Sequence, residues 1–205
     1  MHKIIGAALA LATTVCLTAS TAAAAHAEKV VHRDARGDVI RQDYSFETET
    51  ETETPVPTVK SSDITSTVVD HRRDNVFVTV RHAELDSHLD LLHGYLFSLV
   101  TNERLGRTVV LHVSPSTSRQ GEVKLVTQAG RRVTCIGLRG RIDYRANTVR
   151  IRVPRSCLSN PRWVRAGIYT FHTGRDWSRA FVDDANLNGR IRNAGPVHGP
   201  RVRRG

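Results

Sequence analysis

The segment Arg139–Val153 reads RGRIDYRANTVRIRV. Its second half alternates apolar and basic residues with the two-residue period of a strand that has one buried face: Val149, Arg150, Ile151, Arg152 and Val153. Its first half, up to Arg145, places arginines two apart in the same way. Asn147 lies between the halves, and asparagine tolerates the positive φ of a tight turn. The segment therefore predicts a β-hairpin with an apolar inner face and an arginine outer face.

Similar strand patterns occur on both sides of this hairpin. Valines two residues apart in 75–81 indicate a half-buried strand, with another before it at 64–69 and polar residues between them. Further strands are predicted at 96–100, 108–113, 121–127, 131–138, 163–172 and 180–183. Short strands, polar turns and no long helical pattern favour an all-β fold, an antiparallel β-sandwich of about 8–10 strands. Residues 84–92 are compatible with a helical turn.

The chain divides into four parts. Residues 1–27 have a basic start, an apolar core and a small-residue cleavage site, which predicts a secretory signal peptide and a secreted protein without a membrane span. Residues 28–60 form an N-terminal segment with one strand and a Glu-Thr repeat, which we expect to be a solvated loop. If this repeat were extended, its glutamates would form an acidic strip. Residues 61–190 form the β-sandwich, and the basic Gly/Pro/Arg tail at 191–205 is expected to be mobile.

Cysteine usage predicts one disulfide. Cleavage of the signal peptide removes Cys16 and leaves Cys135 and Cys157 in an oxidising compartment. We place Cys135 within a strand and Cys157 just after one, so a bond between them would tie the central hairpin to a neighbouring strand. The alternative is two free thiols that bind a metal, although the spacing is poor for zinc.

The charge is strongly positive. The chain has 30 lysines and arginines against 20 aspartates and glutamates, a formal net charge of +10. The arginines of the hairpin form the principal candidate site for a polyanion: Arg139, Arg141, Arg145, Arg150 and Arg152. Guanidinium groups bind phosphate and carboxylate through paired hydrogen bonds. The alternative is an ordinary solvated sheet face. We do not expect specific nucleic-acid binding, because no aromatic residues interleave with these arginines.

Two weaker candidates concern sugars and calcium. Trp177 lies among polar residues and is a candidate for stacking on a sugar, whereas Trp163 is expected in the core. Asp184, Asn186 and Asn188, followed by Gly189, match the first half of a calcium loop. Gly195 stands where that loop needs a glutamate, so an Asx-rich surface turn is the alternative. No other cofactor is expected.

Other motifs favour plain structural readings. The acidic and histidine residues of 86–93, including His88 and His93, do not share one face of a helix or strand, so we expect surface polar residues rather than a metal or acid–base site. Arg36-Gly37-Asp38 spells an adhesion tripeptide, but a glycine turn explains it. No nucleophile elbow, phosphate loop, dinucleotide fingerprint or zinc helix is present. These absences leave enzyme activity undecided, and we expect none.

Several sequence blocks resemble a known group of proteins. They are Asp34–Val39, Asp63-Ile64 before the 75–81 strand, Cys135–Leu138, Pro154–Leu158 and Pro161–Gly167. These blocks resemble uncharacterised exported proteins of actinobacteria, over about residues 34 to 190. That group is similar in strand order to β-sandwich modules of the DOMON and carbohydrate-binding kind. The resemblance implies a secreted β-sandwich with a Cys135–Cys157 bridge, and it implies no activity.

Together these patterns predict a secreted, monomeric, non-catalytic binding or structural protein that recognises an extracellular anionic polymer or a cell-wall glycan. A secreted hydrolase with an unrecognised active site is the alternative. A protein that inhibits or chaperones another exported protein is a third hypothesis.

Overall fold

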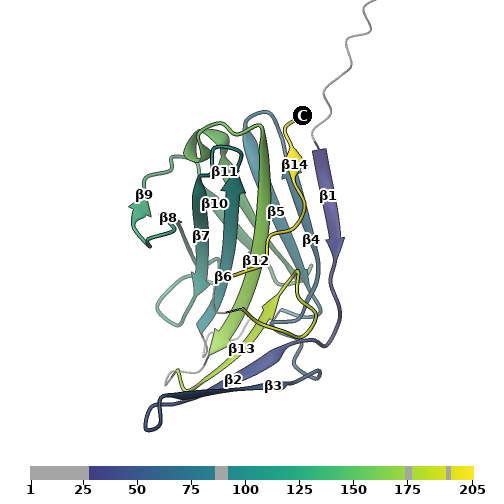
Figure 1. Ribbon diagram of the computed structural model, residues 1–205, viewed down its shortest axis with the longest axis vertical. Coiled ribbons are helices and arrows are strands. Elements are labelled where there is room, and N and C mark those ends of the chain that lie inside the picture. The colour runs from purple at the N-terminus through teal and green to yellow at the C-terminus, as the bar shows by residue number, and fades with distance from the viewer. Residues whose placement is uncertain (1–27, 86–91, 174–176, 193–194) are drawn as a thin grey trace, which may run out of the picture.

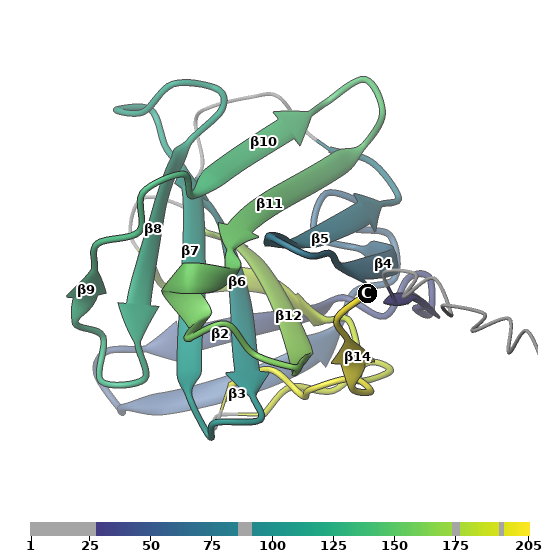
Figure 2. The ribbon, with the colours of Figure 1, turned by 90° about the horizontal axis from the view of Figure 1, so that it is seen from above.

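Two antiparallel β-sheets form the protein. The computed structural model describes residues 28–85, 92–173, 177–192 and 195–205, and Figures 1 and 2 show the sheets in two views. The five-stranded sheet has the order β1-β4-β5-β11-β10. Its strands are β1 (Glu28–Arg33), β4 (Ile64–His71), β5 (Asn75–His82), β10 (Arg139–Asp143) and β11 (Thr148–Pro154).

The second sheet has nine strands in the order β3-β2-β13-β12-β6-β7-β8-β9, with β14 paired to β12. These strands are β2 (Ile40–Ser45), β3 (Thr50–Pro55), β6 (Leu92–Thr101), β7 (Gly106–Val113), β8 (Glu122–Thr127), β9 (Arg132–Val133), β12 (Trp163–Thr173), β13 (Arg179–Asp184) and β14 (Val202–Arg203). A short 3₁₀ helix, η1 (Arg155–Leu158), follows β11. The predicted antiparallel all-β fold is confirmed.

The core lies between the facing sheets. The five-stranded sheet contributes the inward residues of β5 and β11, and the nine-stranded sheet contributes aromatic and aliphatic residues of β6, β7 and β12. Fully buried members include Val78, Ile151, Phe97, Leu111 and Ile168. Burial of such side chains is the main favourable term in folding, at about 1.5–3 kcal/mol for each large aliphatic or aromatic residue.

The predicted central hairpin is present, but its turn is longer than the tight turn that the sequence indicated around Asn147, because β10 ends at Asp143 and β11 begins at Thr148. Arg139 pairs with Arg152 and Arg141 pairs with Arg150 across β10 and β11. Asn147, in the connecting turn, has a φ of +52°, the left-handed conformation that the sequence predicted there. The hairpin thus directs apolar side chains into the core and arginines outward.

The N-terminal segment belongs to both sheets. β1 pairs with β4 in the five-stranded sheet, while β2 pairs with β13 in the other. The Glu-Thr repeat was expected to be a solvated loop, and this expectation was wrong for its second half, which forms edge strand β3. The side chains of the repeat are mostly exposed and contribute little apolar burial. The strand forms because its backbone N–H and C=O groups pair with those of β2.

The C-terminal tail is docked rather than mobile. β14 pairs with β12, placing Val202 opposite Val164. Val202 is buried, and its carbonyl lies 3.1 Å from Nδ1 of the buried His71. The buried Val202 and hydrogen bonds to neighbouring strands, including those that Arg165 donates to the carbonyls of His198 and Gly199, therefore hold a segment whose composition is typical of disorder.

The predicted disulfide is present. Cys135 and Cys157 are bonded. Cys135 does not lie within a strand, as the sequence suggested, because β9 ends at Val133. Cys157 lies in η1, so the bond connects the loop after the nine-stranded sheet's edge to the end of β11. It closes a loop around the central hairpin and joins the two sheets.

The proposed signal peptide, residues 1–27, lies outside the described residues. Among the residues that the structure describes, no helix is long and apolar enough to cross a membrane.

We predict that the variant with both Cys135→Ser and Cys157→Ser is less stable by about 3 kcal/mol. Without the bond, the unfolded chain is no longer restricted by a closed loop between two cysteines 22 residues apart, so its conformational entropy is higher. Guanidinium unfolding with and without dithiothreitol measures the effect. Reductant should lower the midpoint of the wild type and leave that of the double variant unchanged. Equal midpoints for reduced and oxidised wild type would contradict the prediction.

Candidate functional site

Four arginines line the outer face of the hairpin. Arg139, Arg141, Arg150 and Arg152 are all exposed. Their cross-strand pairing places them on one side of β10 and β11, while Ile142, Val149 and Ile151 are buried on the other. Arg145, the fifth predicted member, lies in the turn after β10 rather than on the sheet. The sequence prediction is therefore confirmed for the position of four of the five residues.

Strand β5 extends this surface. It pairs with β11 so that Arg150 lies opposite Thr79 and Arg152 opposite Phe77. Arg81, at the end of β5, is also exposed and lies opposite Thr148. We call Arg81, Arg139, Arg141, Arg150 and Arg152 the arginine face. The alternating valines of 75–81 could have shown that Arg81 points outward, but not that β5 neighbours β11.

An aromatic ring lies within the arginine face. The guanidinium of Arg150 is 4.4 Å from the centroid of the Phe77 ring, and that of Arg72 is 4.9 Å from it. Sequence reasoning assumed that no aromatic residue interleaves with these arginines, and the pairing of β5 with β11 corrects that assumption. Stacking on the ring holds the Arg150 side chain over the sheet.

A shallow hollow of about 250 Å³ lies between the strands of this face. Its lining consists of Thr79, Arg141, Asp143, Thr148 and Arg150. Two guanidinium groups and two hydroxyl groups are donors that suit a phosphate, sulfate or carboxylate group. Asp143 is the one acid of the lining, and its Oδ2 is 3.9 Å from a terminal nitrogen of Arg141.

The charge of the arginine face is little compensated. Within the described parts of the chain, the ion pairs closer than 4.0 Å include none for Arg81, Arg139, Arg150 or Arg152. The Glu-Thr strip does not neutralise it, because β3 is an edge strand of the other sheet (Figure 1). Arg152 donates instead to the side-chain oxygen of Asn75, at 2.8 Å.

The predicted calcium-loop residues do not form a ligand set of their own. Asp184 is buried, and its two carboxylate oxygens accept hydrogen bonds from the backbone N–H groups of Asn186 and Val197, at 3.0 and 2.8 Å. Asn186 donates to the carbonyl of Val197 at 2.9 Å, and Asn188 is exposed. These contacts fit the alternative of an Asx turn, which here also fastens the tail.

A different group of carboxylates comes together beside that turn. Asp38, Asp63 and Asp183 each place a carboxylate oxygen within 4.8 Å of the others. Asp38 precedes β2, Asp63 precedes β4, and Asp183 lies in β13. We call these three residues the carboxylate cluster, with Asp34 as its neighbour. No sequence pattern predicted that Asp38 and Asp63 meet Asp183, because the three residues are distant in sequence.

Burial changes the protonation of this region. Burial, followed by the charge of Asp38, raises the pKa of Asp34 to about 8. Burial also raises the pKa of Asp183 to about 9, against the lowering effect of a hydrogen bond from the Ile64 N–H. The pKa values of Asp38 and Asp63 are raised by burial as well. The shifts follow from the cost of placing several negative charges in a water-poor site.

The two tryptophans differ in exposure. Trp177 is 59% exposed, as predicted for a sugar-stacking residue. Trp163 is half-buried rather than in the core, and the guanidinium of Arg201 lies 4.7 Å from its ring centroid.

The remaining motifs have structural roles or lie outside the described residues. Residues 86–91, which include His88, are outside them. His93 is buried on β6, where the centroid of its ring lies 5.4 Å from that of His172. The expectation that it is a surface residue was therefore wrong. The adhesion tripeptide is a turn: Gly37 has a φ of +71° and its N–H donates to Asp63. The glycine-turn reading of Arg36-Gly37-Asp38 is the one that the geometry supports.

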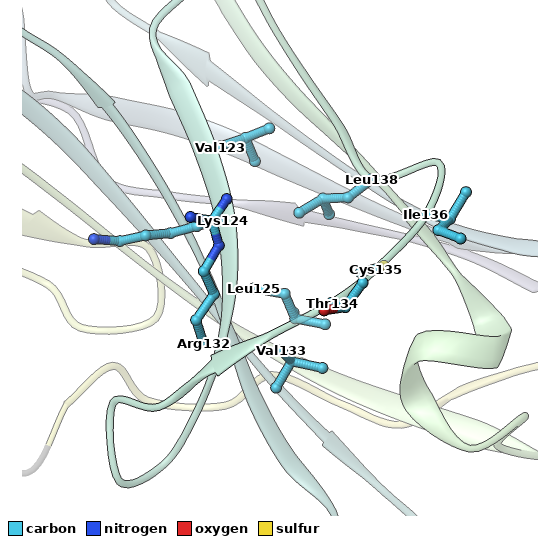
Figure 3. A pocket seen from close by; sticks show the side chains of 9 residues that line it. All are labelled: Val123, Lys124, Leu125, Arg132, Val133, Thr134, Cys135, Ile136 and Leu138. Carbon is cyan, nitrogen blue, oxygen red and sulfur yellow. The ribbon is translucent and has the colours of Figure 1, made fainter.

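A separate hollow of about 360 Å³ lies beside the disulfide, between β8, β9 and the loop that carries Cys135. Figure 3 shows apolar side chains around it, with Lys124 and Arg132 on the side opposite Ile136. Ile136 is 91% exposed at its rim. No sequence pattern predicted this hollow, because it depends on the position of the short strand β9.

Comparison with known proteins adds no assignment: no family model, no curated protein and no solved structure matches the chain significantly. The resemblance to exported β-sandwich proteins therefore stays a prediction.

We predict that, in buffer free of divalent cations, the free energy of unfolding falls as the pH rises from 7 to 9. Folded Asp34 and Asp183, with pKa values of about 8 and 9, retain protons that the unfolded chain has lost near pH 3.8. Because the folded state binds more protons over this range, stability decreases with pH. Burial lowers the pKa values of His71, His82 and His198, so these three histidines stay neutral over this range and do not contribute.

Urea unfolding at a series of pH values measures this dependence. The charges that act on the two acids are those of Asp38, Asp63 and Asp184, while Arg36 acts on Asp63 and Arg192 on Asp184. Asp183→Asn should make the dependence shallower, because an amide has no proton to lose in this range. A stability that is constant or rises from pH 7 to 9 would refute the prediction.

Proposed function

We propose that the protein is a secreted, non-catalytic binding protein that recognises an extracellular anionic polymer through the arginine face. The observation that carries this proposal is the hollow between Arg141 and Arg150, where guanidinium and hydroxyl donors surround a space for one anionic group. The arginines next to the hollow extend the positive surface along the sheet in both directions. A polymer with regularly spaced charges could contact several of them at once.

The arrangement of the arginines supports this proposal over a merely solvated face. Like charges in directly opposed cross-strand positions repel each other, and here two such pairs adjoin, Arg139 with Arg152 and Arg141 with Arg150. A bound polyanion would relieve this repulsion. The proposed ligand class is a polymer that carries phosphate or carboxylate groups, such as an anionic wall polymer, because both groups accept paired hydrogen bonds from guanidinium.

The exposure of the arginine face favours an electrostatic interaction that weakens as salt is added. The arginines are exposed, so counterions screen their attraction to a polymer strongly at physiological ionic strength. Retention on isolated cell-wall material should accordingly fall steeply as salt is added.

We predict that the variant with both Arg150→Glu and Arg152→Glu loses at least about tenfold in affinity for isolated wall polymer at low salt, since two charge-assisted contacts are replaced by repulsion. Sedimentation of the protein with insoluble wall fractions across a sodium chloride series measures the affinity. The matched control is Arg131→Glu with Arg132→Glu, which makes the same charge change at two exposed positions at the start of β9, away from the arginine face. Equal losses in both variants, or none in the first, would show that the arginine face is not the binding site.

Replacement of Arg150 and Arg152 by lysine separates charge from geometry. Lysine keeps the positive charge but lacks the planar fork that binds an anion through two hydrogen bonds. We expect this variant to retain binding at low salt and to lose it at a lower salt concentration than the wild type. Circular dichroism and the melting temperature check that each variant is folded.

Sugar binding is the second candidate, and the exposure of Trp177 favours it. A stacked sugar would be held without charge, so retention on a neutral insoluble glycan should resist salt and disappear with Trp177→Ala. The hydrolase alternative would need carboxylates in an open cleft. The carboxylate cluster does not offer such a cleft, since Asp63 and Asp183 are buried.

A further inference from the structure

The carboxylate cluster contains acceptor oxygens with no donor. Asp63 is 3% exposed, and its Oδ1 has no hydrogen-bond partner. Oδ1 of Asp38 and Oδ2 of Asp34 are likewise buried without a partner. A buried carboxylate oxygen that has lost its water and gained nothing costs free energy, and folded proteins rarely leave one in that state. Three in one small region indicate that something else contacts them.

The other oxygens of these side chains are fixed by the backbone. Oδ2 of Asp63 accepts from the Gly37 N–H at 3.1 Å, Oδ2 of Asp38 from the Gly189 N–H at 3.1 Å, and Oδ2 of Asp183 from the Ile64 N–H at 2.7 Å. The three N–H groups come from separate parts of the fold: Gly37 lies between β1 and β2, Ile64 begins β4, and Gly189 follows β13. One oxygen of each carboxylate is thus held by a rigid donor, which orients the side chain and leaves its second oxygen available within the cluster.

Positive side chains do not complete the cluster. Arg36 and Arg192 lie close enough to lower the pKa values of Asp63 and Asp184 respectively through their charge. Neither guanidinium, however, is among the ion pairs within 4.0 Å in the described residues. The negative charge of the cluster is therefore not neutralised by a direct partner from the described chain.

We propose that Asp38, Asp63 and Asp183 bind a divalent cation, and that this cation is Ca²⁺. Hard oxygen ligands without nitrogen or sulfur select Ca²⁺ or Mg²⁺ over zinc. Ca²⁺ takes oxygens at 2.3–2.6 Å in irregular arrangements, so two of its ligands can lie up to about 5 Å apart. The separations within 4.8 Å fit that range. Mg²⁺ would require oxygens at 2.0–2.1 Å in a near-octahedral arrangement, which three carboxylates from three separate parts of the chain supply less readily.

The bound cation has a structural role in the fold. Asp183 belongs to β13 of the nine-stranded sheet, and Asp38 leads into β2 of the same sheet. Asp63 leads into β4 of the five-stranded sheet. A cation shared by the three carboxylates would join the two sheets. In Figure 1 the start of β2 lies at the lower end of the molecule, and η1, which carries Cys157, lies at the upper end. The cation and the disulfide would therefore connect the sheets at opposite ends.

The experiment compares the melting temperature of the mature chain in EDTA with that in 10 mM CaCl₂, at constant ionic strength. A ligand that binds only the folded state stabilises it, and we expect a rise of roughly 5 °C if the concentration is about a hundred times the dissociation constant. Calorimetric titration of the EDTA-treated protein with CaCl₂ should show one site, and MgCl₂ should bind at least tenfold more weakly. An identical melting temperature in both buffers, with no heat of binding, would overturn the proposal.

Variants locate the site. Asp63→Asn and Asp183→Asn keep the size of each side chain and remove a charged ligand, so each should abolish the calcium response. The matched control is Asp74→Asn, the same change at an exposed carboxylate in the turn between β4 and β5, which should respond like the wild type. A calcium response that persists in Asp63→Asn and Asp183→Asn would assign the binding to another acidic region and refute this site. If neither variant folds, the titration of the wild type, with its one-site stoichiometry and preference for Ca²⁺ over Mg²⁺, still confirms or refutes the proposal.

Discussion

The contact between the two apolar sheet faces governs the rest of the structure. Side chains alternate along a strand, so a buried inner face at Val149 and Ile151 requires that Arg150 and Arg152 point to water. A one-residue shift of register would place the guanidinium groups in the core, at a cost that no other contact could offset. The exposed arginine face and the buried core are thus two consequences of one pairing pattern.

The edges of the sandwich are secured by other means. At one end, the Cys135–Cys157 bond fixes the loop after β9 to η1. At the other, backbone N–H groups bind the carboxylates of Asp38, Asp63 and Asp183. The chain changes sheets between β1 and β2, and Gly37, with its positive φ, lies in this crossing. The carboxylates therefore gather where the chain crosses from one sheet to the other.

The two charged regions have different physical roles. The arginine face is exposed and screened by solvent, so it suits reversible, salt-dependent contact with an external polymer. The carboxylate cluster is buried, so its charge has to be met by protons or by a cation within the protein. Surface charge here concerns binding, whereas buried charge concerns the stability of the fold.

Local pattern predicted a large part of this molecule. The hairpin, most strands of 64–184, the positive φ of Asn147 and the disulfide follow from alternation, turn chemistry and cysteine count. Prediction failed where pairing partners supply the stabilisation. The Glu-Thr repeat became strand β3 through hydrogen bonds to β2, and the tail was docked by β14 against β12. No residue within either segment signals these partners.

The candidate sites divide in the same way. The two-residue period of one hairpin predicted that Arg139, Arg141, Arg150 and Arg152 share a face, but it also placed Arg145 there, which lies in the turn because β10 ends at Asp143. The meeting of Asp38 and Asp63 with Asp183, and the position of Phe77 and Arg81 beside Arg150, depend on strands that are distant in sequence and adjacent in space. Periodicity determines which way a side chain points. Only the packing of whole sheets determines which residues lie next to that side chain. The order in which strands pair is set by the free energy of the entire core, not by the preference of any one segment.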